Sequence, residues 1–355
     1  MATLTGRIAY IRDNSAFVEP ASGGKASYLP GSSGASLVCC GPHEGTVLLF
    51  SAPSRNPHDP LSPRGEPMRV LLTKPPYQTA LTMPPPADRI VRPRAFWTPS
   101  GAAVLRDGLP VAARGFVVEA DEKTIQPLPF PFDTATNNVA QAVGLVTPGG
   151  GVYELHAWNR KANKERLLLT NRTPAPLDAA LVAARIAPAK TAPNRLWQFF
   201  TPTLTSNGNT VYFAAHDGTT ASVRLFACEI ATGQLRLVLP DVGDGSGRQS
   251  NFVLSPDNKR LLWERETGGA RYSGQVAVAD LQTGRLLTIP GTAAKNRRTV
   301  TAGACWSPDG RYLAVAVGYF GSASVPARYD ILVCETVTGK PIRTIPNAFG
   351  PSWGP

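Results

Sequence analysis

Three features of the sequence predict an all-β fold built from repeated four-stranded units. Glycine and proline number 33 and 34 among 355 residues, which is typical of many short elements joined by turns. Hydrophobic residues make up 43% of the chain and charged residues 17%, so a large core can be buried. The third feature is a segment that recurs seven times. Together these features predict a seven-bladed β-propeller, with six blades as the alternative, in a single domain spanning residues 1–355.

The recurring segment consists of two β-rich runs joined by a turn and closed by a proline. It is clearest in LFACEIATGQLRLVLP, VAVADLQTGRLLTIP and DILVCETVTGKPIRTIP, which share a Thr-Gly turn, and four earlier segments have the same shape with a degraded turn. The spacing between closing prolines, 45 to 66 residues, leaves room for two further strands in each unit. The prolines are Pro30, Pro84, Pro129, Pro174, Pro240, Pro290 and Pro346.

The two further strands flank a second turn, seen best in CWSPDGRYLAVAV (Cys305–Val317). Proline presets φ at the first turn position, and Gly or Asn accepts a positive φ later in the turn. The pattern recurs in FVLSPDNKRLLWE, LTSNGNTVYFAA and FWTPSGAAVLR, and VCCGPHEGTVLLF is a degraded copy. In the fourth unit the copy is ambiguous, because LVTPGG is either this turn or the one after it. Four antiparallel strands per unit are typical of a propeller blade.

The two ends of the chain predict how the propeller closes. Residues Thr5–Pro30 supply only three strands, in RIAYIRD, AFVEP and ASYLP, whereas the chain stops with FGPSWGP. That final segment matches the innermost strand of a unit, with Trp353 in the place of Trp306 and Trp97. We therefore expect the C-terminal segment to pair with the N-terminal unit, which would remove the exposed sheet edges that invite aggregation.

Two insertions interrupt the repeat. The segment PLDAALVAARIAPA is rich in alanine and has apolar residues at helical spacing, so it predicts a short helix at about residues 175–190, between the fourth and fifth blades. The segment Ser54–Pro67 has the composition of an irregular loop.

The WSPDG box at Trp306–Gly310, followed by a hairpin with a Thr-Gly turn, resembles the PD40 (WD40-like) repeats of the TolB-like propeller family. The resemblance covers essentially the whole chain, although the box is decayed in the other units. It implies a non-enzymatic scaffold that binds a protein or peptide across one face and the central funnel of the propeller.

The sequence shows no constellation of catalytic or metal-binding residues, and it predicts no cofactor. The four histidines lack metal-ligand spacing, and no GxSxG elbow is present. Asp241, Asp244 and Ser246 fall short of the oxygen ligands that Ca²⁺ needs, so we interpret them as residues that stabilise a turn. The five cysteines lie mostly in apolar runs and are predicted to be reduced, buried thiols: Cys39, Cys40, Cys228, Cys305 and Cys334.

The net charge of +11 and the pI near 9.7 favour anionic partners. Arginines recur where an outer strand connects to the next inner strand, and in a propeller these connections surround one mouth of the channel. The guanidinium suits carboxylates and phosphates, so our hypothesis is a basic funnel that binds an acidic peptide or protein. The alternative is that these are solvated loop charges. The candidate residues are Arg92, Arg94, Arg195, Arg248, Arg297 and Arg298.

Two other functions stay open at this point. One is an enzyme of the lyase or hydrolase type with a site in the funnel; the other is a nucleic-acid role, suggested by charge alone without a reading motif. No apolar run is long enough to span a membrane, and Met1–Tyr10 lacks the order of a signal peptide. Reduced cysteines and this N-terminus favour the cytoplasm, and a trimmed N-terminus would leave the periplasm open.

Overall fold

The computed structural model describes strands, one helix and some of the segments between them. The described residues are 4–41, 47–51, 69–74, 78–83, 93–97, 103–107, 115–118, 125–127, 132–136, 139–188, 197–217, 222–244, 250–267, 273–289, 299–320 and 326–355. Within them, the strands form seven four-stranded antiparallel sheets. The chain divides into two compact units, residues Met1–Pro129 with Ile289–Pro355 and residues Phe130–Thr288.

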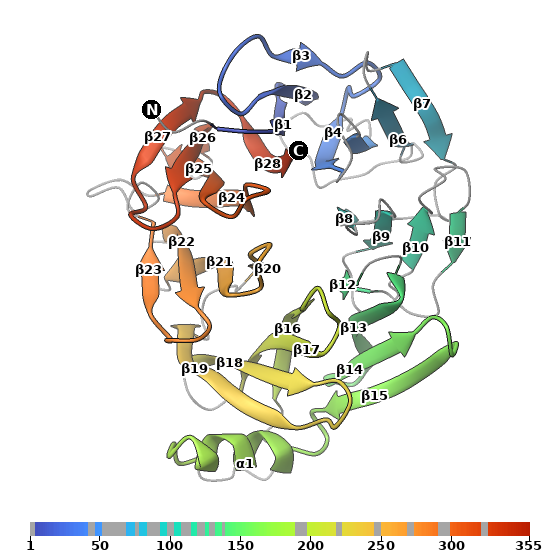
Figure 1. Ribbon diagram of the computed structural model, residues 1–355, viewed down its shortest axis with the longest axis vertical. Coiled ribbons are helices and arrows are strands. Elements are labelled where there is room, and N and C mark those ends of the chain that lie inside the picture. The colour runs from blue at the N-terminus through green and yellow to red at the C-terminus, as the bar shows by residue number, and fades with distance from the viewer. Residues whose placement is uncertain are drawn as a thin grey trace. The chain divides into compact units, whose positions relative to one another are not determined.

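The first unit contains four of these sheets, which Figure 1 shows in blue to teal and in red. In each strand order below we call the first strand the inner strand and the last the outer strand, and strands consecutive in sequence pair with each other. The first sheet has the order β28-β1-β2-β3, the second β4 to β7, the third β8 to β11 and the seventh β24 to β27. The strands are β1 (Arg7–Arg12), β2 (Ser15–Pro20), β3 (Ser27–Tyr28), β4 (Ala35–Cys40), β5 (Val47–Ser51), β6 (Arg69–Lys74), β7 (Gln78–Met83), β8 (Pro93–Trp97), β9 (Ala103–Asp107), β10 (Gly115–Val118), β11 (Ile125–Pro127), β24 (Thr299–Trp306), β25 (Tyr312–Phe320), β26 (Pro326–Glu335), β27 (Pro341–Ile345) and β28 (Phe349–Gly354).

The second unit contains the other three sheets and one helix. The fourth, fifth and sixth sheets have the orders β12 to β15, β16 to β19 and β20 to β23. The elements are β12 (Thr134–Ala135), β13 (Gln141–Gly149), β14 (Val152–Asn159), β15 (Lys164–Thr170), α1 (Ala175–Ala183), β16 (Gln198–Leu204), β17 (Thr210–His216), β18 (Ser222–Glu229), β19 (Leu235–Asp244), β20 (Ser250–Leu254), β21 (Arg260–Thr267), β22 (Ser273–Asp280) and β23 (Leu286–Thr288).

The C-terminal strand β28 completes the N-terminal sheet, as the two ends of the sequence predict. It pairs antiparallel with β1, so that Gly354 lies opposite Arg7 and Trp353 opposite Ile8. The indole nitrogen of Trp353 also donates a hydrogen bond to the carbonyl of Thr5 at 3.0 Å. The first sheet is therefore built from both ends of the chain.

The turn between the first two strands of a sheet has one hydrogen-bond pattern in four sheets. In the seventh sheet the amide of Ser307 bonds the carbonyl of Tyr312, and the amide of Tyr312 returns a bond to the Ser307 hydroxyl. The same exchange joins Ser255 with Arg260, Thr205 with Thr210 and Thr136 with Gln141. Residues Thr136–Gln141 are therefore the inner turn of the fourth sheet, and LVTPGG lies at the following turn, between β13 and β14.

A second backbone bond ties this inner turn to the outer turn of the same sheet. The amide just after the third strand donates to a carbonyl of the inner turn, as in Thr336 to Arg311 at 2.9 Å. Equivalent bonds join Ile230 to Asn209, Leu281 to Lys259 and Arg160 to Ala140, and in the first sheet, which has no inner turn, Ala21 bonds Gly6 just before β1. Because five sheets share this bond, the sequence repeat corresponds to a repeated backbone structure.

Apolar side chains between neighbouring sheets of each unit form the core. In the second unit, a cluster of aromatic rings lies between the fourth and fifth sheets and includes Trp197, Phe199, Phe213 and Phe226, all at most 1% exposed. Burying side chains of this size contributes roughly 2 kcal/mol each to folding. In the first unit, Tyr10, Ile331 and Trp353 belong to the cluster that joins the first and seventh sheets.

Helix α1 lies between β15 and β16 in sequence, at the predicted insertion, and contacts β19. Its buried residues Leu177 and Leu181 join the core between the fourth and fifth sheets. The helix is shorter than the predicted range of about 175–190. It ends at Ala183 because Arg185 has a φ of +60°, which a helix cannot continue, and Pro188 follows soon after.

Candidate functional site

The predicted arginines fall between sheets in sequence, except for one. Arg92, Arg195, Arg248, Arg297 and Arg298 lie outside the described residues. Arg94 instead belongs to strand β8, where its backbone lies opposite that of Arg106 on β9, and its side chain is outside the described part. The prediction that Arg94 belongs to a connection is therefore wrong, because the strand begins at Pro93.

The other arginines all lie in the same kind of connection, as the strand order shows. Arg92 falls between β7 and β8, Arg195 between β15 and β16, and Arg248 between β19 and β20. Arg297 and Arg298 fall between β23 and β24. In each case the chain passes from the last strand of one sheet to the first strand of the next.

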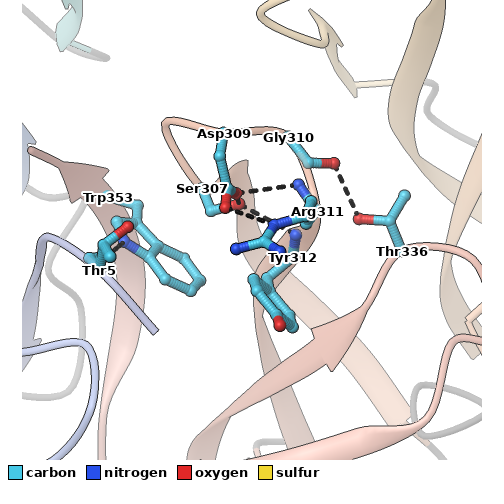
Figure 2. Close-up of polar contacts among 8 residues, drawn as sticks. All are labelled: Thr5, Ser307, Asp309, Gly310, Arg311, Tyr312, Thr336 and Trp353. Carbon is cyan, nitrogen blue, oxygen red and sulfur yellow. Dashed lines mark hydrogen bonds and ion pairs between the residues drawn. The ribbon is translucent and has the colours of Figure 1, made fainter. Parts of the chain in front are cut away.

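The polar side chains of the inner turns, in contrast, form hydrogen bonds within the turns themselves. Figure 2 shows this for the seventh sheet, where Asp309 accepts hydrogen bonds from the Ser307 hydroxyl at 2.7 Å and from the Arg311 backbone at 3.0 Å. The Arg311 guanidinium also donates to Asp309, and the Thr336 hydroxyl donates to the Gly310 carbonyl. These contacts stabilise the turn.

The pKa values of the turn aspartates agree with this structural role. Partial burial acts to raise the pKa of Asp309, but hydrogen bonds from Ser307 and Arg311 outweigh it and lower the pKa below its usual value. Asp257 in the sixth sheet shows the same balance, with Ser255 and Lys259 as donors. Both carboxylates therefore stay ionised at neutral pH.

Arginines on outer strands join adjacent sheets. Arg343 on β27 donates to the carbonyls of Pro20 and Ala21, at the outer turn of the first sheet, and to the buried carboxylate of Glu19. Arg166 on β15 makes the equivalent contacts with the carbonyls of Ile230 and Ala231, at 2.7 and 2.8 Å. We call this contact the arginine clamp. Our sequence analysis missed it, although an arginine recurs shortly after the outer turn in KER, QLR and KPIR.

The clamp at Arg343 is part of a buried network in the first unit. The Tyr10 hydroxyl donates to Glu19 at 2.8 Å, and both burial and this hydrogen bond raise the pKa of Tyr10. The Arg12 guanidinium lies 5.0 Å from the centre of the Tyr10 ring and donates to the Pro346 carbonyl. Every group in the network contacts a structural partner, so we assign it to stability.

Buried ion pairs lie in both units. Asp217, which is fully buried, pairs with Arg224 at 3.2 Å in the fifth sheet. Asp330 accepts hydrogen bonds from Arg328 and from the backbone of Asn347, which holds the chain as it enters β28. Pairing of this kind compensates for the desolvation of a charge.

His156 contacts two acidic side chains. Its Nε2 lies 3.1 Å from Glu154 and its Nδ1 lies 2.6 Å from Glu165, across strands β14 and β15. Within the described part of the chain, no group of three or more His, Cys, Asp or Glu residues has the geometry to hold a metal ion. The three side chains thus form a local contact between neighbouring strands.

The cysteines are thiols, and Cys228 and Cys334 are buried as predicted, whereas the other three are half-buried. Desolvation by burial raises the pKa of Cys40 and Cys228 to about 11 and that of Cys39 and Cys334 to about 12. Because the thiolate is the reactive form, these groups are poor nucleophiles at neutral pH. As for membranes, none of the helices in the described residues has the length and apolar character that a crossing requires.

Comparisons with known proteins give no match in sequence and many in structure. No family model matches the chain, and no curated protein does. A prolyl endopeptidase matches with 11% identity and a TM-score of 0.59, over 98% of this chain and 49% of that one. A puromycin hydrolase matches with 15% identity and a TM-score of 0.57, over 98% of this chain and 52% of that one.

TolB from Acinetobacter baumannii matches with 12% identity and a TM-score of 0.49, over 99% of this chain and 67% of that one. This chain spans about half the length of the two hydrolases, so their activities belong to larger proteins. Identities this low show the fold alone. The chain therefore shares a β-propeller fold with the matched parts of the two hydrolases, in agreement with its repeats.

Proposed function

We propose that this protein is a non-enzymatic scaffold that binds an acidic protein or peptide at one face of its propeller. In this proposal the seven sheets are the blades of one ring, which β28 closes. The observation that carries the proposal is the recurrence of arginine in one type of connection, between the last strand of one sheet and the first strand of the next. In a propeller such connections surround one mouth of the central channel, so their charges would add to a single positive field.

The contacts of the described residues support this proposal. The turn aspartates, the clamp arginines and the buried ion pairs all serve structural contacts. The chain nevertheless carries 36 basic against 25 acidic residues. The arginines of the connections are thus the natural source of an anion-binding surface.

The test is an affinity purification of the tagged protein from its host across a salt series, with a charge-neutral variant beside it. The variant replaces one arginine in each of the four connections with glutamine: Arg92, Arg195, Arg248 and Arg298. We expect the wild type to retain an acidic partner that high salt releases and the variant to lose it. The control replaces four exposed basic residues on the opposite turns with glutamine: Lys25, Lys259, Arg285 and Lys340.

Each outcome decides between the candidates. Loss of the partner in the first variant and retention in the control supports the basic funnel. Equal retention in both variants refutes it. No partner at any salt concentration would favour the alternative prediction, an enzyme with a small ligand in the funnel, and would refute the scaffold.

A further inference from the structure

The outer edge of β15 differs from the other sheet edges that the structure describes. Strand β15 (Lys164–Thr170) is the last strand of the fourth sheet and pairs with β14 alone. Figure 1 shows it in green at one edge of its sheet, beside β14. The second edge of a strand presents amide and carbonyl groups that another strand can pair with. β15 is seven residues long, which is enough to template such pairing.

The other described outer strands are shorter or otherwise protected. β3 has two residues, and β11 and β23 have three each. β27 begins with Pro341, which has no amide hydrogen to donate, and helix α1 contacts β19. The side chains of β7 lie outside the described part. Among the outer strands whose side chains are described, β15 is long, has no proline and has no helix in contact with it that the structure shows.

The side chains around this edge combine exposed positive charge with an exposed apolar residue. Lys161, Lys164 and Arg172 are exposed, and no ion pair of theirs is found among the described residues. The nearby carboxylates, Glu154 and Glu165, both contact His156. Leu167, in the middle of the strand, is 47% exposed.

We propose that the free edge of β15 binds an extended acidic segment of a partner protein, added as a fifth strand of this sheet. Backbone hydrogen bonds along β15 would supply the affinity, as in other cases of strand addition. Acidic side chains of the partner would pair with Lys161, Lys164 and Arg172, and an apolar one would cover Leu167. This surface is distinct from the arginine connections, so the inference does not depend on the proposed function.

The test uses a fluorescent peptide of about eight residues in which glutamate and valine alternate, long enough to span β15. We expect saturable binding by fluorescence anisotropy that weakens as salt is raised. The double variant Lys161→Glu and Lys164→Glu changes only exposed residues and should weaken binding at least about tenfold. Failure to detect saturable binding at low salt would overturn the proposal.

Two controls separate strand addition from general attraction to a basic protein. Lys340 ends the outer turn of the seventh sheet as Lys164 ends that of the fourth, and Pro341 follows it. Lys340→Glu should leave binding unchanged, and equal weakening would refute a specific site. A peptide of the same charge with alternate amides N-methylated cannot complete the strand, so it should bind at least about tenfold more weakly. Equal binding of both peptides would also refute the proposal.

Hydrogen exchange and sedimentation complete the test. The peptide should slow exchange at the amides of Leu167–Leu169 and leave β27 unaffected. If the protein instead forms dimers that Lys164→Glu dissociates, the occupant of the edge is a second copy of the chain, and the proposal of an acidic partner is wrong.

Discussion

At the scale of single residues, the carboxylate of Asp309 illustrates how polar groups stabilise the inner turns. It accepts hydrogen bonds from the Ser307 hydroxyl and from the backbone and guanidinium of Arg311. Asp309→Ala should therefore lower the free energy of unfolding by about 1–2 kcal/mol, measured by urea denaturation. Asp309→Asn keeps one acceptor oxygen, so it should lower the free energy of unfolding less than Asp309→Ala does. Arg311→Ala is the control, since its ion pair is exposed and should contribute less to stability; a larger loss in Arg311→Ala than in Asp309→Ala would contradict this assignment.

The same carboxylates predict how stability changes with pH. The pKa values of Asp257 and Asp309 are lower in the folded protein than their usual values, so the folded state favours the ionised form. Their contribution to the free energy of unfolding is present above pH about 4 and is lost as the pH falls through the folded pKa values. We expect urea denaturation between pH 7 and pH 3 to show a steeper decline in the wild type than in Asp257→Asn/Asp309→Asn. Identical slopes would mean that other groups control acid stability.

At the scale of elements, the arginine clamp joins the outer strand of one sheet to the outer turn of the next. Replacing Arg343 with alanine would leave the buried carboxylate of Glu19 without its cation, so the free energy of unfolding should fall by about 2–4 kcal/mol. Lys340→Ala, at an exposed position three residues earlier, should change it by less than about 0.5 kcal/mol. The measurement is thermal or urea unfolding followed by circular dichroism, and similar losses in the two variants would show that the clamp is not specific.

The inner turns show which elements a sequence can predict and which it cannot. The SPDG and SPDN turns were predicted because proline, aspartate and glycine or asparagine each have a known place in a turn. The turn at Thr136–Gln141 has neither proline nor glycine, and Val139 adopts a φ of +53° there. Asn137 and Asn138 favour a turn by composition, but a β-branched residue in the left-handed region is rare, so composition does not predict the conformation of Val139. The end of α1 was missed for a similar reason, since Arg185 adopts a positive φ.

At the scale of the whole molecule, the pairing of β28 with β1 makes the C-terminal segment necessary for the N-terminal sheet. Deleting residues Phe349–Pro355 would expose the edge of β1 and remove Trp353 from the core around Tyr10 and Ile331. We expect a large fall in the melting temperature, measured by circular dichroism. A circular permutant that joins residue 355 to residue 1 through a flexible linker keeps the pair and should melt near the wild type. An unchanged melting temperature after the deletion would contradict the importance of this strand pair.

The contacts that join sheets were beyond sequence analysis because their partners are far apart in the chain. Arg343 and Glu19 are separated by 324 positions, and only the order of the sheets brings them together. The repeat predicted the four-stranded unit and the role of FGPSWGP, since both depend on patterns within or between copies of that unit. The sequence places the arginines of the connections between sheets. Whether their side chains gather at one surface stays a prediction, because the connections share no repeated sequence pattern that would define their conformation.

The pairing of β28 with β1 also bears on how the protein is made. A ribosome releases a chain from its N-terminus, so β1, β2 and β3 emerge first, while the strand that completes their sheet is available only after residue 354 has been synthesised. Throughout translation β1 presents an open edge. The later sheets need no such delay, because each is formed from strands that follow one another. Of the seven described sheets, the one whose β1, β2 and β3 are made first is thus the last to be finished, and a factor that protects nascent chains would have β1 as the edge to shield.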